Sequence, residues 1–118
     1  MLNPSSGKDE GGVEAAILAG AADLLKALGH PLRLRIVCGL LQRPLTQTEI
    51  ACCLGLPQSS VAQHLAVLRR AGLVDGRRSA NQVILGIADP RAEAVLRALC
   101  PDGTLARAFA RMKPEESH

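Results

Sequence analysis

Apolar residues recur every three or four positions through the first part of the chain, which is the spacing of helices with one apolar face. The pattern predicts a first helix from Val13 to Gly29 and a second helix between Pro31 and Pro44. Residues 1–12 are polar and rich in Gly and Ser, so we expect a mobile segment there. The apolar residues of the first helix are Val13, Ile17, Ala21, Leu24, Leu25 and Leu28.

Two shorter helices are predicted next, with a break between them of the helix-turn-helix kind. Thr46 and Glu49 have the spacing of a capping box, in which each side chain accepts from an N–H group at a helix start. The first of the two helices ends at Gly55, and the second runs from Gln58 to Gly72. Their inward residues are predicted to be Ile50, Cys53 and Leu54, followed by Val61, Leu65 and Leu68.

After Gly72 the apolar period changes from helical to two, which is typical of strands. Leu73 and Val74 begin a strand, RRSANQ at 77–82 is expected to form a turn, and Val83, Leu85 and Ile87 alternate along the return strand. Pro90 opens a last helix that ends at Pro101. The fold predicted is mainly α with a small β-hairpin: a winged helix-turn-helix domain over 13–103, then a C-terminal basic segment and tail at 104–118.

Composition narrows the function classes. One Phe and no Trp or Tyr exclude a site built on stacked aromatic rings, which the common single-strand and RNA-binding modules use. The net charge of +3 is compatible with a polyanionic partner. We see no signal peptide and no apolar run long enough to span a membrane, so we expect a soluble cytoplasmic protein whose four cysteines are thiols.

The start of the second short helix carries the chemistry of base recognition. Its short and amide side chains both donate and accept hydrogen bonds, as base edges in the major groove require. The segment from Gln58 to Ser79 contains four arginines and one aspartate, a net charge of +3 that equals that of the whole chain. The wing arginines are expected to contact phosphate or the adjacent minor groove. The predicted contacts to double-stranded DNA are Thr46, Gln47, Gln58, Ser59, Ser60, Gln63, His64, Arg69, Arg77 and Arg78.

Two other interpretations of these residues are possible besides DNA binding. The arginines and polar side chains could be solvated surface, or the winged helix could bind a protein instead of DNA. His64 lacks a Cys, Asp or Glu at metal-ligand spacing on its own helix, and His30 is expected to cap the helix that begins at Pro31. The sequence contains no P-loop, GxGxxG, GxSxG, HExxH or CxxC. We therefore expect no enzyme, no cofactor and no resident metal.

Three segments resemble the ArsR/SmtB family of dimeric repressors over roughly residues 20–100: HPLRLRIVCGLL at 30–41, LTQTEIACCLGLPQSSVAQHLAVLRRAGLV, and IADPRAEAVLRAL. The resemblance implies a winged-helix homodimer that pairs through its first and last helices. It also implies operator binding in the absence of an inducer and release when a metal or other inducer binds. Two departures are the His30 cap, where an acidic or amide residue is usual, and a wing without aromatic residues.

The family's sensor sites can be compared residue by residue. Its arsenic site needs cysteines where this chain has Thr46 and Thr48, and its zinc site needs histidines that do not follow Asp89. Cys38 corresponds to one cysteine of the persulfide- and redox-sensing branch, and Cys100 lies about one helical turn (~5.4 Å) before the branch's second cysteine. The resemblance therefore implies a repressor released from its operator by an oxidant or reactive sulfur species acting on Cys38 and Cys100.

Two alternatives for the cysteines remain open at this stage. Cys38 and Cys53 could simply pack in the core, because free cysteines are among the most buried residues, and core packing is our expectation for Cys53. A thiophilic ion such as As(III) or Cd(II) could instead be held by the cysteines, including Cys52 and Cys53.

Overall fold

The computed structural model describes residues 8–102 and 104, with side chains from residue 11 onward. Of the terminal segments predicted at 1–12 and 104–118, residues 1–7 and 105–118 lie outside the described residues. In chain order the elements are α1 (Lys8–Leu28), α2 (Pro31–Gln42), α3 (Gln47–Leu54), α4 (Gln58–Arg70), β1 (Val74–Ser79), β2 (Gln82–Ile87) and α5 (Arg91–Leu99). The predicted mainly α architecture with one hairpin is confirmed.

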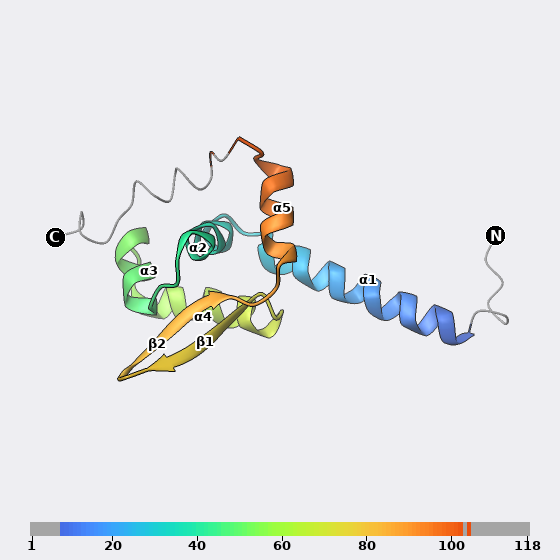
Figure 1. Ribbon diagram of the computed structural model, residues 1–118, viewed down its shortest axis with the longest axis horizontal. Helices are drawn as coiled ribbons and strands as arrows, with labels where there is room; N and C mark the ends of the chain where they lie inside the picture. Colours follow the sequence, from blue (N-terminus) through green and yellow to red (C-terminus); the bar gives the residue numbers. More distant parts are fainter. Residues whose placement is uncertain (1–7, 103, 105–118) are drawn as a thin grey trace.

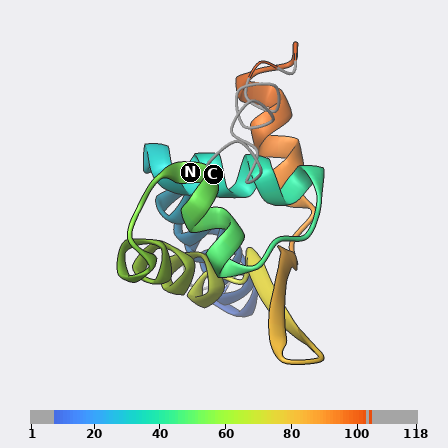
Figure 2. The same cartoon turned by 90° about the vertical axis from the view of Figure 1, so that its left-hand side faces the viewer.

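The core lies where α2 is surrounded by the other elements (Figures 1 and 2). Helix α4, with α3 packed against it, lies on one side of α2, and the two-stranded antiparallel sheet and the base of α5 close another. The largest side chains with almost no exposure are Ile36, Val37, Leu45, Ile50, Val61, Leu68 and Leu73. The predicted inward residues of the helix-turn-helix are buried, apart from the half-buried Leu54.

Local capping fixes where the helices begin and end. His30 Nδ1 accepts from the N–H of Leu32 at 3.1 Å, so the predicted cap of α2 is confirmed. The Thr46 hydroxyl accepts from the N–H of Glu49 at 3.1 Å, and the Glu49 carboxylate accepts from the N–H of Thr46 at 2.8 Å. This capping box begins α3, and Gly55, at a left-handed φ of 66°, ends it.

Helix α1 differs from its prediction at both its start and its surface. It begins at Lys8 instead of Val13, because adding a residue to an existing helix gains one hydrogen bond without the cost of nucleation. Residues 8–12, expected to be mobile, are therefore helical. Only the C-terminal end of its apolar face, Leu24 and Leu28, enters the core. Helix α1 otherwise projects from the body of the molecule (Figure 1).

The hairpin turn is shorter than predicted. RRSANQ was expected to form the turn, but Arg77, Arg78 and Ser79 belong to β1 and Gln82 opens β2, so only residues 80 and 81 connect the strands. Ala80 has a φ of 56°, a conformation usually taken by Gly, Asn or Asp, and this is why the sequence signalled a wider loop. The two wing arginines therefore project from a regular strand.

The last helix, which was predicted to end at Pro101, is also shorter than expected. Helix α5 ends at Leu99, and Cys100 is its C-terminal cap, with its N–H bonded to the Leu96 carbonyl. Cys38 is buried in α2, and Cys53 is buried in α3 as expected. Among the helices of the described residues, none is long and apolar enough to cross a membrane.

Candidate nucleic-acid interface

The outward face of α4 is polar at its start and basic at its end. Ser59 and Gln63 are exposed one turn apart, Ser60 is half-buried, and Arg69 and Arg70 are exposed in the last turn. No side chain caps this helix at Pro57, and within its first turn the N–H of Ser60 donates to the Pro57 carbonyl at 3.1 Å. A surface of this kind suits base edges and phosphate in a duplex.

Gln58 is exposed but already joined to α3. Its Oε1 accepts from Gln47 Nε2 at 3.2 Å, and its Nε2 donates to the Thr48 hydroxyl at 3.0 Å. Gln47 Nε2 also lies 3.3 Å from the Gln58 carbonyl. These bonds hold the starts of α3 and α4 together, so two of the predicted DNA contacts, Gln47 and Gln58, brace the helix-turn-helix. The Thr46 hydroxyl is likewise occupied as the cap of α3.

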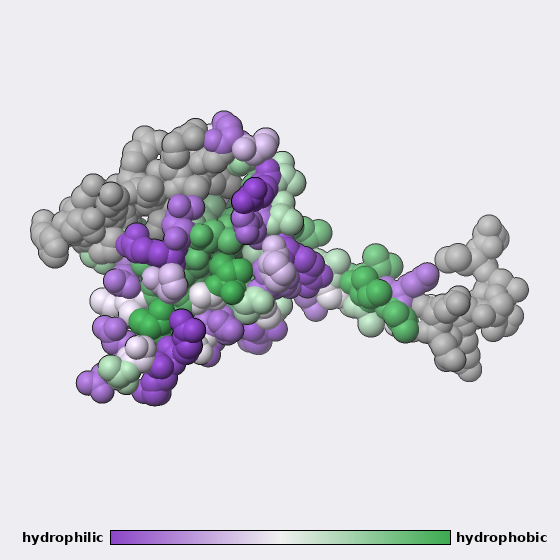
Figure 3. Space-filling model, in the orientation of Figure 1, coloured by the Kyte–Doolittle hydropathy of each residue, from purple (hydrophilic) through white to green (hydrophobic). Residues whose placement is uncertain are grey.

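The hairpin lies beside α4 and supplies a second basic surface. Arg77 and Arg78 are exposed on β1, and Figure 3 shows the hairpin end of the molecule as largely hydrophilic. A depression between α4 and β2 is lined by Arg69 and Arg70 on one side and Val83 on the other. Because Gly76 has no side chain, Val83 and Arg69 can lie close to β1: a Cβ at Gly76 would lie 2.8 Å from Val83 Cγ1 and 3.6 Å from an Arg69 guanidinium nitrogen.

His64 does not lie with the exposed residues of α4. Its imidazole is half-buried and turned toward the start of α2, where its ring centroid is 4.6 Å from that of His30. Arg33 Nη1 is 3.4 Å from His64 Nδ1. Burial first, and then the charges of His30 and Arg33, lower the pKa of His64 below the usual 6.5. The helical period alone put this residue on the polar surface, and tertiary packing turns it inward.

Arg33 contacts two other helices, and the sequence reasoning did not single it out. It is half-buried in α2 and donates to the carbonyls of Lys26 and Ala27 at the end of α1, as well as lying against His64. Two of its partners are backbone atoms, which carry no residue-type signal. Only the Leu-Arg-Leu-Arg alternation at the start of α2, with one arginine on the inner side, could have suggested it.

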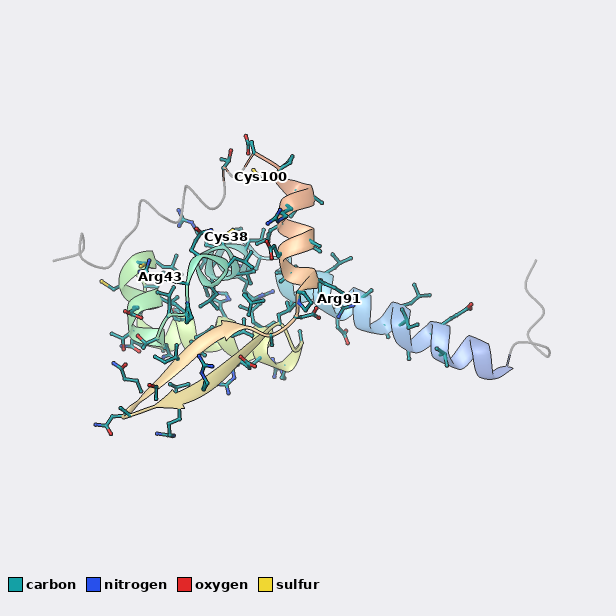
Figure 4. The ribbon with its side chains drawn as sticks, in the orientation of Figure 1. Cys38, Arg43, Arg91 and Cys100 are labelled. Atoms are coloured by element: carbon teal, nitrogen blue, oxygen red, sulfur yellow. The ribbon has the colours of Figure 1, made fainter. Side chains whose placement is uncertain are left out.

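The cysteines fall into two groups. Cys52 and Cys53 are neighbours on α3, the first half-buried and the second buried. Cys38 on α2 and Cys100 after α5 both lie on the side of the molecule away from the hairpin (Figure 4). Over residues 8–102 and 104, no three His, Cys, Asp or Glu side chains converge closely enough to hold a metal ion.

Burial raises the pKa of the Cys38 thiol, and the charge of Cys100 raises it further. Cys100 is half-buried and donates its S–H to Asp102 Oδ1 at 3.4 Å. Asp102 Oδ1 also accepts from the N–H and the hydroxyl of Thr104, at 3.0 and 2.6 Å. Cys100 is therefore the more accessible of the two thiols.

Known proteins resemble this chain in both sequence and fold. The family described as bacterial regulatory protein, arsR family, matches residues 30–75. The biofilm growth-associated repressor of Agrobacterium fabrum is 41% identical over 78 residues, which are 66% of this chain and 67% of that protein. This chain belongs to the ArsR family. Its members bind DNA as transcriptional regulators, and the winged helix-turn-helix prediction is confirmed.

Solved structures of the ArsR type extend the likeness to most of the chain. Reduced HlyU from Vibrio cholerae N16961 has a TM-score of 0.66 at 38% identity, over 74% of this chain and 95% of that one. The homodimeric winged helix-turn-helix domain Mb0332 from Mycobacterium bovis has a TM-score of 0.68 at 29% identity, over 80% of this chain and 89% of that one. The arrangement of α4 and the hairpin is thus that of DNA-binding regulators.

Proposed function

We propose that this ArsR-family chain is a homodimeric repressor of double-stranded operator DNA, released by thiol chemistry at Cys38 and Cys100. The observation that carries the proposal is the placement of these two thiols on the same side of the molecule, Cys38 buried in α2 and Cys100 half-buried after α5. The similar structure of reduced HlyU is named for its redox state, which supports the same reading.

The accessibilities of the two thiols suggest an order of events. Cys100 meets an oxidant of the peroxide or polysulfide class first, since Cys38 is buried and its pKa is raised. Attack by the Cys100 sulfur breaks the O–O or S–S bond of the oxidant and leaves one fragment on that sulfur. Cys38 then displaces the fragment to form a disulfide, and the two thiol protons leave with the reduced fragments or pass to solvent.

A bond between these sulfurs would join α2 to the end of α5. Helix α2 packs against α4, so a displacement of α2 changes the orientation of the DNA-reading surface. Two copies read half-sites about one helical turn of DNA apart, and a small rotation in each weakens both sets of contacts. The disulfide therefore lowers operator affinity without blocking the DNA-binding surface.

Apolar surface on α1 and α5 supports the homodimer. Val13, Ile17, Leu18 and Leu25 on α1 and Leu99 on α5 are between 57% and 69% exposed. Figure 3 shows the projecting part of α1 as partly hydrophobic. A surface of this kind in a helical protein marks a contact with another chain, and the similar Mb0332 domain is described as homodimeric. We infer that two copies pair through α1 and α5.

Fluorescence anisotropy of a labelled duplex from the gene's own upstream region tests the thiol switch. Reduced protein is expected to bind tightly, to lose at least about tenfold in affinity after diamide or polysulfide (about 1.4 kcal/mol), and to recover with dithiothreitol. Cys38→Ser and Cys100→Ser should bind when reduced and stay bound after treatment. Cys52→Ser, a thiol on α3, is the matched control and should respond like the wild type. A fully responsive Cys38→Ser protein would show that the mechanism is wrong.

A further inference from the structure

Arg33 joins three helices that carry different parts of the function. It lies in the first turns of α2, and its guanidinium reaches the end of α1 on one side and the middle of α4 on the other. Helix α1 bears most of the exposed apolar side chains, and α4 bears the DNA-reading surface. One side chain therefore connects the proposed dimer helix to the recognition helix.

The contact with α1 uses carbonyls of its last turn, one of which, that of Lys26, also accepts from the N–H of Gly29 at 3.1 Å. The last four C=O groups of a helix have no intrahelical partner, and together they carry partial negative charge. Arg33 Nε donates to the Ala27 carbonyl, and Nη2 lies 3.4 Å from the Lys26 carbonyl. A planar cation with fixed donor directions suits two adjacent carbonyls, so this end of the arginine is held in one orientation.

The contact with α4 requires a neutral imidazole. Guanidinium has only donors, so the nitrogen that faces it at 3.4 Å, His64 Nδ1, must accept. Acceptance at Nδ1 requires the tautomer with its proton on Nε2. A second proton would remove the acceptor and place a positive charge against Arg33. The bond to α4 is consequently available only while His64 is uncharged.

We propose that Arg33 is a positioning residue for DNA recognition, which ties α4 to the end of α1 through neutral His64 and releases α4 when His64 is protonated. The proposal rests on DNA reading by α4, a part of the proposed function, and is independent of the cysteines. Acidification is then expected to weaken operator binding even in fully reduced protein.

The surrounding charges favour the neutral form of His64. His30 and Arg33 face it from the start of α2. Asp23 and Lys26 of α1 and Arg70 of α4 line one depression with Arg33. Asp23 is the only acidic residue in this set, so the net charge around the contact is positive. Burial first, and then the charges of His30 and Arg33, lower the pKa of His64, and the bond to Arg33 is formed at neutral pH.

A direct contact between His64 and DNA would have the opposite pH dependence. A protonated imidazole beside a phosphate gains attraction, so acidification would tighten binding and add to its salt dependence. A positioning role predicts weaker binding in acid, with no change in the number of phosphates neutralised. The sign of the pH effect and the salt slope therefore separate the two roles.

The experiment compares four full-length reduced proteins on the same labelled duplex, from pH 7.5 to 5.5 at fixed ionic strength. His64→Asn retains an acceptor at the position of Nδ1 and does not titrate. Arg33→Gln removes the guanidinium group that contacts both α1 and His64. Arg35→Gln, an exposed arginine of the same helix, is the matched control with the same change in charge. His30 is present in all four proteins, so the difference between wild type and His64→Asn isolates His64. Urea unfolding of each variant establishes that it is folded.

We expect the wild type to lose about tenfold in affinity at pH 5.5, and His64→Asn to lose less than about twofold. Arg33→Gln should bind about tenfold more weakly than Arg35→Gln at pH 7.5, with the salt slope of the wild type. Wild-type binding that tightens in acid would overturn the proposal, as would equal affinities for the two arginine variants. A wild type that binds no DNA at any pH would overturn the proposed function itself.

Discussion

The hydroxyl of Thr46 closes the start of α3, and this use determines what a substitution there changes. It accepts from the N–H of Glu49, whose carboxylate accepts from the N–H of Thr46 in return. Both bonds satisfy groups that the helix leaves open, so they contribute to folding before any DNA is bound. A residue predicted to contact DNA thus has a first role in positioning the helix-turn-helix.

We predict that Thr46→Ala lowers the free energy of unfolding by about 1 kcal/mol, because the cap is lost. Thr48→Ala, two residues further on, loses only an exposed bond from Gln58 and should change the free energy of unfolding by less than about 0.5 kcal/mol. Urea denaturation followed by circular dichroism measures both. Equal effects would mean that the capping box contributes nothing beyond surface polarity.

Single residues were predictable from the sequence where their partners are local. The His30 cap and the Thr46 capping box bond within three residues, so spacing alone identified them. His64 and Arg33 lie 31 residues apart in the sequence. The packing of α2 against α4 brings them together, and a periodic pattern contains no information about which helix is opposite.

At the scale of elements, the hairpin depends on one small residue. Gly76 on β1 leaves the space that Val83 of β2 fills, and an added Cβ would lie 2.8 Å from Val83 Cγ1. Gly86, on the other strand of the same hairpin, has nothing within 4 Å of a Cβ. Neither glycine has a positive φ, so the difference between them is steric alone.

Gly76→Ala should therefore destabilise the domain by about 1 kcal/mol, since the branched Val83 side chain must leave its rotamer or its strand must shift. Gly86→Ala serves as the control and should be neutral or slightly stabilising, because Ala loses less backbone entropy on folding. Thermal unfolding of both variants is the measurement. A Gly76→Ala protein as stable as Gly86→Ala would contradict the close approach of the strands.

Most of the elements could be predicted from the sequence, and the errors in their predicted boundaries have physical causes. Pro31, Gly55 and Gly72 mark helix boundaries by backbone chemistry, and those boundaries agree with the structure to within one or two residues. The turn was misjudged because Ala80 adopts a left-handed conformation without the residue type that signals it. Helix α1 was shortened in the prediction because Gly11 and Gly12 are poor helix formers, yet the apolar residues after them extend it.

At the scale of the whole molecule, the apolar residues of α1 fall into a buried group and an exposed group. Leu24 and Leu28 enter the core of their own chain, whereas Val13 and Ile17 face solvent. All four belong to one helical stripe, so the sequence could not distinguish the intramolecular part from the part available to a partner. The same ambiguity explains why the residue pattern by itself, without the family resemblance, did not predict a dimer.

Ile17→Glu should weaken pairing of the proposed homodimer by at least about tenfold, because it introduces a charge into a buried apolar contact. Sedimentation equilibrium measures the dissociation constant. Arg35→Gln, on the exposed side of α2, is expected to leave it unchanged. A dissociation constant equal to that of the wild type would exclude the α1 surface from the dimer.

In the proposed homodimer, the exposed apolar side chains of α1 would also make regulation depend on the number of molecules in a cell. A second copy would bury these side chains, and a chain whose fold gains from association becomes more stable as its concentration rises. A regulator that lowers expression of its own gene would thereby limit its own supply of stable protein. Small changes in synthesis would then alter both occupancy of the operator and the lifetime of the unpaired chain against proteases.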